Sequence, residues 1–207
     1  MLYDITPPIT PDLKVWPGDT PPSREVLLDM GAGANITLST FRASVHVGAH
    51  TDAPSHYGAT APTIEQRDLS YYLGPCQVIH VRDCPRGARV SADMLAESIT
   101  RERVLIATGT YPDPTDFNAD FAGLEPSLVD MLHRRGVRLI GVDTPSVDLF
   151  ESKDLPAHQR FLKNDMAILE GLVLRDVPAG DYELIALPLP LGGFDASPVR
   201  AVLRTLH

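Results

Sequence analysis

Prolines and glycines are distributed along the whole of this 207-residue chain, with 19 of the former and 15 of the latter. Proline lacks a backbone donor and glycine weakens helices and strands, so each tends to end a regular element. Because they are spread along the chain, they indicate many short elements rather than one linker between two domains. No internal repeat, low-complexity tract or block of like charge is present.

The segments between these breaks are mostly strand-like, with helices in the middle of the chain. β-Branched and aromatic residues predict strands over residues 2–5, 36–47, 77–82, 103–107, 137–142, 166–174, 181–187 and 198–203. For the last of these, a short helix capped by Ser197 is the alternative. Helices are expected over residues 91–99, with Ser91 as N-cap, and over residues 126–135, which a glycine follows.

The alternation of strands and helices in the middle of the chain predicts a sheet with parallel portions and covering helices. A chain of this size buries about 70% of the surface that its unfolded form exposes, which is sufficient for one core. We therefore expect a single domain spanning residues 1–207, with a mixed sheet and either α/β or α+β architecture.

Charge and composition exclude several classes of protein. The 18 basic and 27 acidic residues give a formal net charge of −9, which disfavours binding to nucleic-acid phosphates. No segment approaches the ~20 apolar residues of a membrane helix, and the N-terminal residues do not resemble a signal peptide. Cys76 and Cys84 are too few for a disulfide framework, so we expect reduced thiols in a cytoplasmic protein.

Three of the seven histidines lie in the segment SVHVGAHTDAPSHY, which spans residues 44–57. They are His46, His50 and His56, and Asp52 lies among them. Imidazole and carboxylate groups together are ligands of zinc, manganese and iron. One histidine alone would be unremarkable, but the cluster predicts a metal site.

The spacing of the cluster also predicts the path of the chain. The three histidines and Asp52 all occupy even-numbered positions, so a strand would direct their side chains to one face. A helix is disfavoured by Gly48 and Pro54. A straight strand would separate His46 from His50 by about 13 Å, although ligands of one ion lie only about 2 Å from it. We therefore expect a strand that ends near residue 47 and then bends at Gly48, which brings His50 and Asp52 towards His46.

Two later residues could complete the ligand set. Glu170 lies in the run MAILEGLVL, and a glutamate among apolar residues is rarely buried without a partner or an ion. The alternative is an amphipathic helix with Glu170 on its outer face, although the run has no single apolar stripe. The other candidate is His158, in DLPAHQRF, which by itself would be an ordinary loop histidine.

The segment HVGAHTDAPSH, residues 46–56, resembles the H-x-G-[TA]-H-x-D-x-P-x-H motif of the metal-dependent cyclase-like hydrolases. Within this group the chain is similar to the bacterial kynurenine formamidases (arylformamidases). Four further segments carry the similarity over nearly the full chain: WPGDT at 16–20, GVDTPS at 141–146, MAILEG at 166–171 and DASPVRAVL at 195–203.

The resemblance implies a compact cyclase-like fold of the swivelling β/β/α type, with a central mixed, partly barrel-like sheet and flanking helices. It also implies a homodimer or a larger homo-oligomer. The implied cofactor is a pair of zinc ions per subunit, with manganese in some relatives. The implied residue roles are these: His46, His50 and Asp52 at the first ion; Asp52, His158 and Glu170 at the second; His56 as the acid/base; and Trp16 stacked on the aromatic part of the substrate.

The implied reaction is hydrolysis of N-formyl-L-kynurenine to L-kynurenine and formate, in tryptophan catabolism. Zinc lowers the pKa of bound water to about 7, and a histidine can protonate the departing arylamine. Three alternatives stay open: opening of a cyclic amide such as isatin, a non-catalytic metal-binding protein, and an iron redox or dioxygenase site. A serine hydrolase with a G-x-S-x-G elbow is disfavoured because that motif is absent from the sequence.

Overall fold

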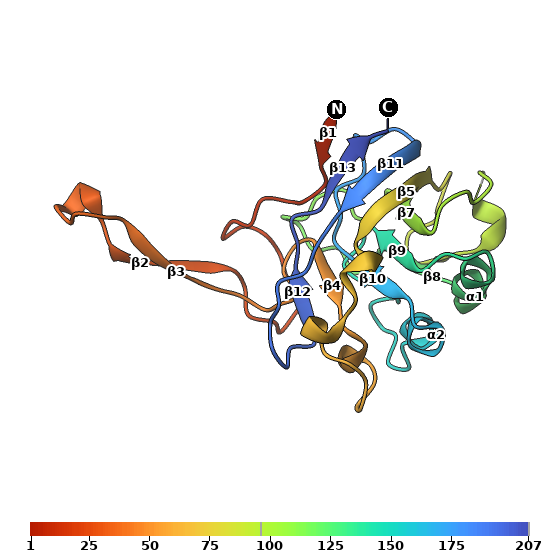
Figure 1. Cartoon of the computed structure of the whole chain (residues 1–207), viewed down its shortest axis with the longest axis horizontal. Coiled ribbons are helices and arrows are strands. Elements are labelled where there is room, and N and C mark those ends of the chain that lie inside the picture. Colours follow the sequence, from red (N-terminus) through yellow and green to blue (C-terminus); the bar gives the residue numbers. More distant parts are fainter. Residues whose placement is uncertain (96, 207) are drawn as a thin grey trace.

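A curled seven-stranded sheet forms the centre of the molecule (Figure 1). The computed structural model describes residues 1–95 and 97–206 of the chain. In spatial order the strands of this sheet are β1 (Leu2–Asp4), β13 (Val202–Thr205), β11 (Gly180–Ile185), β5 (Leu73–His80), β7 (Arg103–Ala107), β9 (Leu139–Val142) and β10 (Ala167–Leu169).

The sheet is mixed, as predicted. Strands β5, β7, β9 and β10 pair in parallel, whereas β1, β13, β11 and β5 pair in antiparallel fashion. Every residue of β7, β9 and β10 is buried, as is typical of parallel strands covered on both faces.

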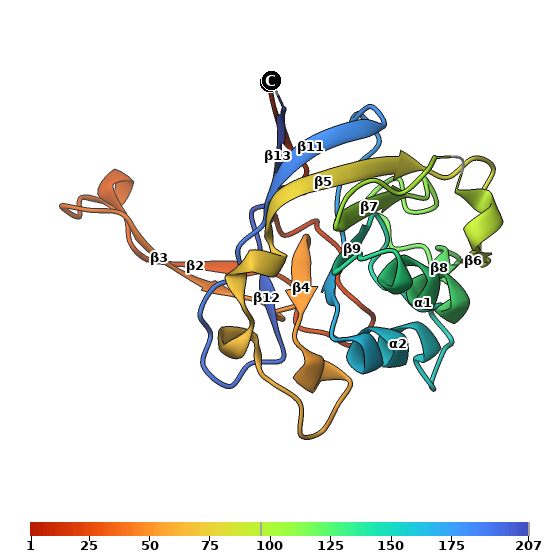
Figure 2. The ribbon, with the colours of Figure 1, turned by 45° about the vertical axis from the view of Figure 1, so that its right-hand side comes forward.

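The two faces of the parallel strands pack against different parts of the chain. One face contacts the helices α1 (Pro126–Arg134) and α2 (Pro156–Asn164), through a core that includes Ile106, Leu132 and Phe161 (Figure 2). The opposite face packs against the segment that carries the histidine cluster, where Ala49 joins the same core as Leu105. The sheet therefore supports the cluster directly.

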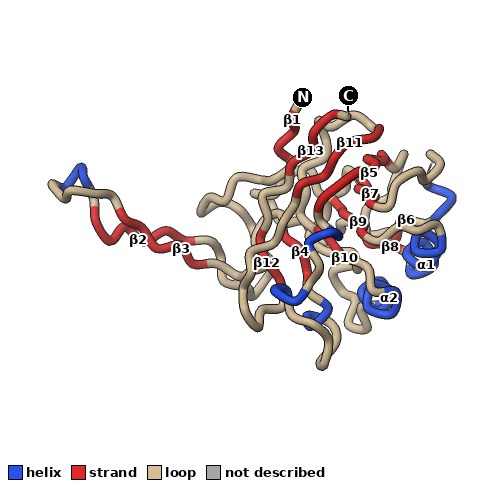
Figure 3. Tube along the Cα trace, in the orientation of Figure 1, coloured by secondary structure: helices blue, strands red, loops and turns tan. Residues whose placement is uncertain are grey.

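Smaller elements complete the fold. Three two-stranded sheets are formed by β4 (His50–Asp52) with β12 (Ala196–Pro198), β2 (Ser23–Leu28) with β3 (Leu38–Arg42), and β6 (Arg89–Val90) with β8 (Gly123–Leu124). Short 3₁₀ turns span Met30–Ala32, Pro54–His56, Ile64–Gln66, Leu69–Tyr71 and Ala92–Met94. The β2–β3 hairpin projects away from the body (Figure 3).

Most predicted strands are confirmed, with shifted ends. The helix predicted over residues 126–135 is α1, and Gly136 follows it with a φ of +85°. The strand predicted over residues 36–47 is shorter, because β3 ends at Arg42. Residues 198–203 contribute to β12 and β13, so the alternative of a helix capped by Ser197 is wrong.

The helix predicted over residues 91–99 is wrong. Only a 3₁₀ turn forms, over Ala92–Met94, and position 96 lies outside the described residues. Ser91 makes no capping bond to the backbone, and its hydroxyl instead lies 2.5 Å from the Asp93 carboxylate. Serine and aspartate favour turns over helix interiors because the local hydrogen bonds of their side chains compete with the hydrogen bonds of the helix backbone.

Both cysteines are free, as predicted. Burial raises the pKa of the Cys76 thiol to about 12, so it stays protonated at neutral pH. In the part of the chain that the structure describes, neither helix has the length and apolar character needed to cross a membrane.

Candidate metal centre

The chain reverses direction within the histidine cluster. Residues 45–49 form a turn in which Gly48 has a φ of +61°, a conformation that favours glycine. Strand β4 then begins at His50 and pairs with β12, which places Asp52 opposite Ala196. The predicted bend at Gly48 is therefore confirmed.

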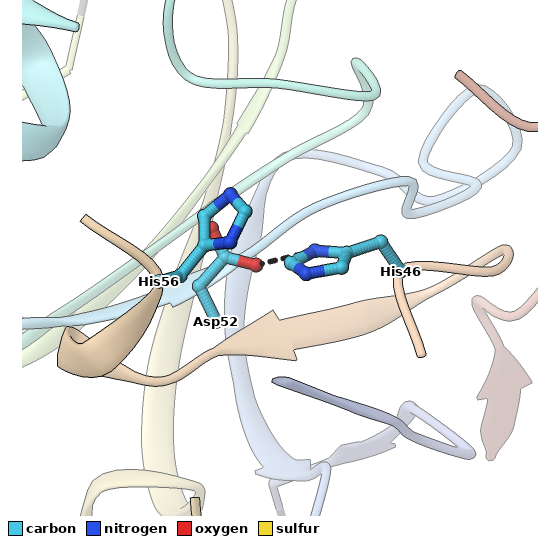
Figure 4. A group of neighbouring side chains, drawn as sticks. All are labelled: His46, Asp52 and His56. Atoms are coloured by element: carbon cyan, nitrogen blue, oxygen red, sulfur yellow. Dashed lines mark ion pairs between the residues drawn. The ribbon is translucent and has the colours of Figure 1, made fainter. Parts of the chain in front are cut away.

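Three histidines surround the carboxylate of Asp52, namely His46, His50 and His158. Figure 4 shows Asp52 with His46 and with the neighbouring His56. Asp52 Oδ1 lies 3.0 Å from His46 Nδ1 and 3.5 Å from His50 Nε2. Asp52 Oδ2 lies 3.5 Å from His158 Nε2. Asp52 is only 2% exposed, yet neither of its oxygens accepts a geometrically sound hydrogen bond from the described residues.

Glu170 approaches the same histidines from a second segment. Its backbone N–H donates to the His50 carbonyl at 3.0 Å, and its carbonyl accepts from the His50 N–H at 3.1 Å. Its carboxylate oxygens lie 3.3 Å from His50 Nε2 and 3.7 Å from His158 Nε2. Glu170 is 3% exposed and extended, so the alternative of an outward-facing helical residue is wrong.

The spacing of these atoms fits a metal ion. Two ligand atoms that each lie about 2.1 Å from a tetrahedral ion are about 3.4 Å apart. The four distances from His50 and His158 Nε2 to the carboxylate oxygens are 3.3, 3.5, 3.5 and 3.7 Å. Burying a carboxylate without hydrogen bonds is costly, and a cation would remove that cost for Asp52. The imidazole and carboxylate donors suit zinc, manganese or iron.

The potential ligands form two groups that share Asp52. The donor atoms of His50, Asp52 and Glu170 lie within 4.8 Å of one another, as do those of His46, Asp52 and His56. The structure thus brings the five expected ligands and His56 to one centre. It divides them differently from the sets that the resemblance implies, because His56 groups with His46.

The carboxylates of the centre favour positive charge on the histidines. Burial lowers the pKa of His46, but Asp52 and Asp195 outweigh it and raise this pKa to about 9. Burial also opposes protonation of His158, but Asp148 and Asp52 raise its pKa to about 10. Burial alone would raise the pKa of Asp52, yet the imidazoles hold it well below its usual value. The centre therefore attracts positive charge, whether protons or a metal ion supply it.

His158 lies on a helix rather than in the expected loop. It belongs to the first turn of α2, which starts at Pro156. The carboxylate of Asp148 accepts from the backbone N–H groups of Ala157 and His158, at 3.0 and 3.1 Å, and so satisfies donors at the helix terminus. Pro156 was the signal for this helix, because proline favours the first turn.

Asp148 also orients the His158 ring, and sequence reasoning missed this residue. Its Oδ2 lies 2.9 Å from His158 Nδ1, while Arg89 donates to its Oδ1 at 2.7 Å. A proton held on Nδ1 leaves the Nε2 lone pair free for a metal, as is typical of carboxylate–histidine–metal arrangements. The sequence carries no motif that distinguishes Asp148 from other acidic residues.

Asp195 is the second functional residue that sequence reasoning missed. Its Oδ2 lies 2.9 Å from His46 Nε2 and 3.3 Å from His56 Nδ1. His56 ends a 3₁₀ turn, is partly exposed, and has its ring centroid 4.3 Å from that of His46. Asp195 lies in one of the segments that carry the family resemblance, which was the available signal.

A cavity of about 730 Å³ adjoins the centre, and its lining includes His50, His158 and Glu170. Trp16, which we expected at the substrate, also lines this cavity. Its ring centroid lies 4.9 Å from that of Phe150 and is one of a cluster of aromatic rings with Phe117, Phe121 and Tyr111. The cavity thus joins the ligand cluster to an aromatic wall.

Asp143 stabilises the loop that carries Tyr111. Its carboxylate accepts from the backbone N–H groups of Thr108 and Gly109, at 2.9 and 2.8 Å. Burial raises the pKa of Asp143, although these hydrogen bonds oppose the shift. The loop is thereby fixed to the end of β9.

Gly171→Ala tests the contact that positions His50. Gly171 has a φ of +66°, and an added Cβ would lie 2.2 Å from the Gly48 carbonyl oxygen, which is 3.0 Å from His50 Nδ1. The clash must displace this carbonyl, so we expect zinc affinity to fall about 10-fold or more in competition titrations. Gly87→Ala is the matched control, since Gly87 has a φ of +69° but no atom near its Cβ. Equal zinc affinities in the two variants would contradict this role of Gly171.

Asp148→Asn tests the orientation of His158. The amide can donate a hydrogen bond to Nδ1, which would move the ring proton to Nε2 and block its lone pair. We expect zinc affinity to fall about 10–100-fold with the fold preserved, as judged by competition titration and circular dichroism. Asp130→Asn, on α1, is the control. Wild-type zinc affinity in Asp148→Asn would show that Asp148 does not set the tautomer.

The comparisons with known proteins agree with this geometry. The model of the Cyclase family matches residues 3–149. The structure of a potential metal-dependent hydrolase with cyclase activity has a TM-score of 0.84 and 29% identity, over 98% of this chain and 96% of that one. A structure described as a predicted metal-dependent hydrolase, from Bacillus stearothermophilus, has a TM-score of 0.81 and 29% identity, over 98% and 97% of the chains.

More distant structures share the fold. Isatin hydrolase A from Labrenzia aggregata has a TM-score of 0.83 and 20% identity, over 100% of this chain and 94% of that one. The expected cyclase-like fold is therefore confirmed. Because the family model covers well over half of its length, the chain belongs to the Cyclase family, a cyclase-like family of metal-dependent hydrolases.

Proposed function

We propose that this protein is an arylformamidase that hydrolyses N-formyl-L-kynurenine to L-kynurenine and formate. The observation that carries the proposal is the position of the buried histidine–carboxylate centre at a cavity with an aromatic wall. A formyl carbon is small enough to reach such a centre, while the aryl ring of the substrate requires an apolar surface.

Two zinc ions, or manganese ions, would be held by His46, His50, Asp52, His158 and Glu170, with Asp52 shared between them. When bound, such an ion supplies a nucleophile at neutral pH and stabilises a developing oxyanion, because it lowers the pKa of coordinated water to about 7. The protein contributes ligands fixed by backbone pairing between β4 and the Glu170 segment. That rigidity keeps the ligands in place before the substrate arrives.

The cavity also suits the rest of the substrate. Trp16 and Tyr111 line it and can contact the aryl ring. Lys14 and Arg175 line it too, and their charges can pair with the carboxylate of the amino-acid group. Arg175 donates to the Pro112 carbonyl at 2.9 Å, which holds its side chain beside the loop of Tyr111.

His56 is suited to protonate the departing nitrogen. Its Nδ1 lies 3.3 Å from Asp195 Oδ2, so the carboxylate can orient the ring. The ring is partly exposed and lines the cavity beside His46. An arylamine leaving group requires one proton, and His56 can deliver it from Nε2.

A cyclic amide such as isatin is the second candidate substrate. Its support is the likeness of the fold to isatin hydrolase A and to an isatin hydrolase bound to the product analogue thioisatinate. Isatin also has an aryl ring, but it has no amino-acid group that Lys14 or Arg175 could bind. These two side chains therefore discriminate between the candidates.

The function is tested by formate release after removal and restoration of metal. We expect a chelator to abolish hydrolysis of N-formyl-L-kynurenine, and zinc or manganese to restore it. Arg175→Gln should raise KM for this substrate about 10-fold, because a charged hydrogen bond is lost, and should leave N-formylaniline hydrolysis unchanged. Activity that persists without metal, or faster opening of isatin by the wild-type protein, would overturn the proposal.

The role of His56 is tested with His56→Asn. We expect full zinc content and an unchanged KM, with kcat reduced about 10²–10⁴-fold, because the proton donor is lost. The loss should be smaller for formamides of more acidic arylamines, which need less protonation. His133→Asn, at an exposed position on α1, is the control. Loss of zinc would identify His56 as a ligand instead, and near-normal turnover would exclude the catalytic role.

A further inference from the structure

Asp143 is a buried carboxylate that directly follows strand β9. It is 8% exposed and lines the cavity beside the metal centre. Residues 139, 141 and 143 alternate towards one face of the sheet, the face against which the histidine segment packs. The neighbouring strand β7 ends at the same level, since Ile106 pairs with Val142 (Figure 2). Asp143 therefore lies at the edge of the sheet where the metal centre is built.

The hydrogen bonds of Asp143 stabilise its ionised form. Its Oδ1 accepts from the Thr108 N–H at 2.9 Å and from the Thr108 hydroxyl at 2.7 Å, while its Oδ2 accepts from the Gly109 N–H at 2.8 Å. The Thr108 hydroxyl in turn lies 2.8 Å from that of Thr110, which accepts from the Ala122 N–H at 2.9 Å. The hydroxyl protons can thus be directed in sequence towards the carboxylate. Donors to both oxygens favour the charged form.

This negative charge has no cationic partner within the part of the chain that the structure describes. None of the ion pairs found there includes Asp143. Aspartate is rarely buried without a partner, and burial raises the pKa of this carboxyl group. The three hydrogen bonds use three of the roughly four acceptor positions of a carboxylate, so one position on Oδ2 is available to a ligand in the cavity.

The other carboxylates that line the cavity are engaged or solvated. Glu170 is a potential metal ligand, and Asp195 lies 2.9 Å from His46 Nε2. Asp19 is only half-buried, so water can solvate its charge. Asp143 belongs to neither group of potential metal ligands among the described residues. It therefore supplies a buried negative charge that a cationic group of a ligand can pair with.

Positive charge lies on the same wall of the cavity. The loop that Asp143 fixes at Thr108 and Gly109 continues to Pro112, whose carbonyl accepts from Arg175 at 2.9 Å. Arg175 and Lys14 both line the cavity. The wall thus presents a carboxylate and cationic side chains that do not neutralise each other. This pattern complements a zwitterion, in which an ammonium and a carboxylate share one carbon.

We infer that Asp143 binds the ammonium group of a zwitterionic α-amino-acid substrate, while Arg175 and Lys14 bind its carboxylate. The inference rests on the proposed function, because it concerns the amino-acid part of the arylformamide. It makes Asp143 a specificity-determining residue. A formanilide without an ammonium group leaves the carboxylate of Asp143 unpaired in the occupied cavity, so the site discriminates against it.

The experiment compares N-formyl-L-kynurenine with its des-amino analogue, which keeps the aryl ring, the ketone and the carboxylate. We expect the wild-type protein to have a KM about 10-fold or more lower for the amino acid, because a charged hydrogen bond is made only there. In Asp143→Asn the two KM values should become equal, mainly through a higher KM for the amino acid. A change of both KM values by the same factor would show that Asp143 only supports the loop, and would overturn the inference.

Thr108→Val is the matched control. It removes the hydroxyl that donates to Asp143 and so perturbs the same loop, but it keeps the negative charge. We expect this variant to retain the preference for the ammonium group, whatever its effect on the two KM values in common. Loss of the preference in Thr108→Val to the extent seen in Asp143→Asn would assign the effect to the position of the loop and contradict the inference.

Binding without turnover separates this inference from the proposed function. We expect zinc-loaded wild-type protein to bind L-kynurenine about 10-fold or more tighter than des-amino kynurenine in calorimetric titrations, and Asp143→Asn to bind both equally. If N-formyl-L-kynurenine is not hydrolysed, the proposed function fails, and these titrations still test Asp143. Equal Kd values in the wild-type protein overturn the ammonium site. Loss of the preference in Asp19→Asn but not in Asp143→Asn would assign the ammonium group to Asp19 and also overturn it.

Discussion

The structure depends on the carboxylate of Asp52, which is buried among three imidazoles and accepts no geometrically sound hydrogen bond from the part of the chain that the structure describes. A charge in this position is tolerated only if positive charge surrounds it. The raised pKa values of His46 and His158 express the same requirement. Around this one group, the separations between nitrogen and oxygen atoms match those of ligands on a metal ion, and a cavity of about 730 Å³ adjoins the same histidines.

Backbone contacts, rather than side-chain packing alone, bring the ligands to Asp52. The reciprocal hydrogen bonds between His50 and Glu170 fix two ligands in one step. The close approach of Gly171 to the Gly48 carbonyl leaves no room for a side chain and holds the imidazole of His50. On the other side, Asp148 both caps α2 and orients His158. Positional precision in this centre therefore comes from pairs of segments that restrain each other.

The predictable part of this site is the part that is local in sequence. The even spacing of the histidines and Asp52, together with the glycine at position 48, was sufficient to predict the bend between His46 and His50. The apolar residues around Glu170 indicated that its side chain is buried. Asp148 was missed because its role arises only when the end of β9 meets α2 in three dimensions. The β2–β3 hairpin was missed for a related reason: residues 36–47 were interpreted as one strand, residues 23–28 were assigned no element, and a sequence does not show that a hairpin leaves the body.

The ligands come from segments far apart in the chain, with His46 to His56 near the beginning and His158 to Glu170 near the end, followed by Asp195. Contacts of such long range form late, because the loop between them must close first. During synthesis, the N-terminal histidines are exposed well before the residues that complete their centre have been made. A metal ion held by ligands from both parts of the chain would therefore stabilise only a polypeptide in which both parts have reached their final positions.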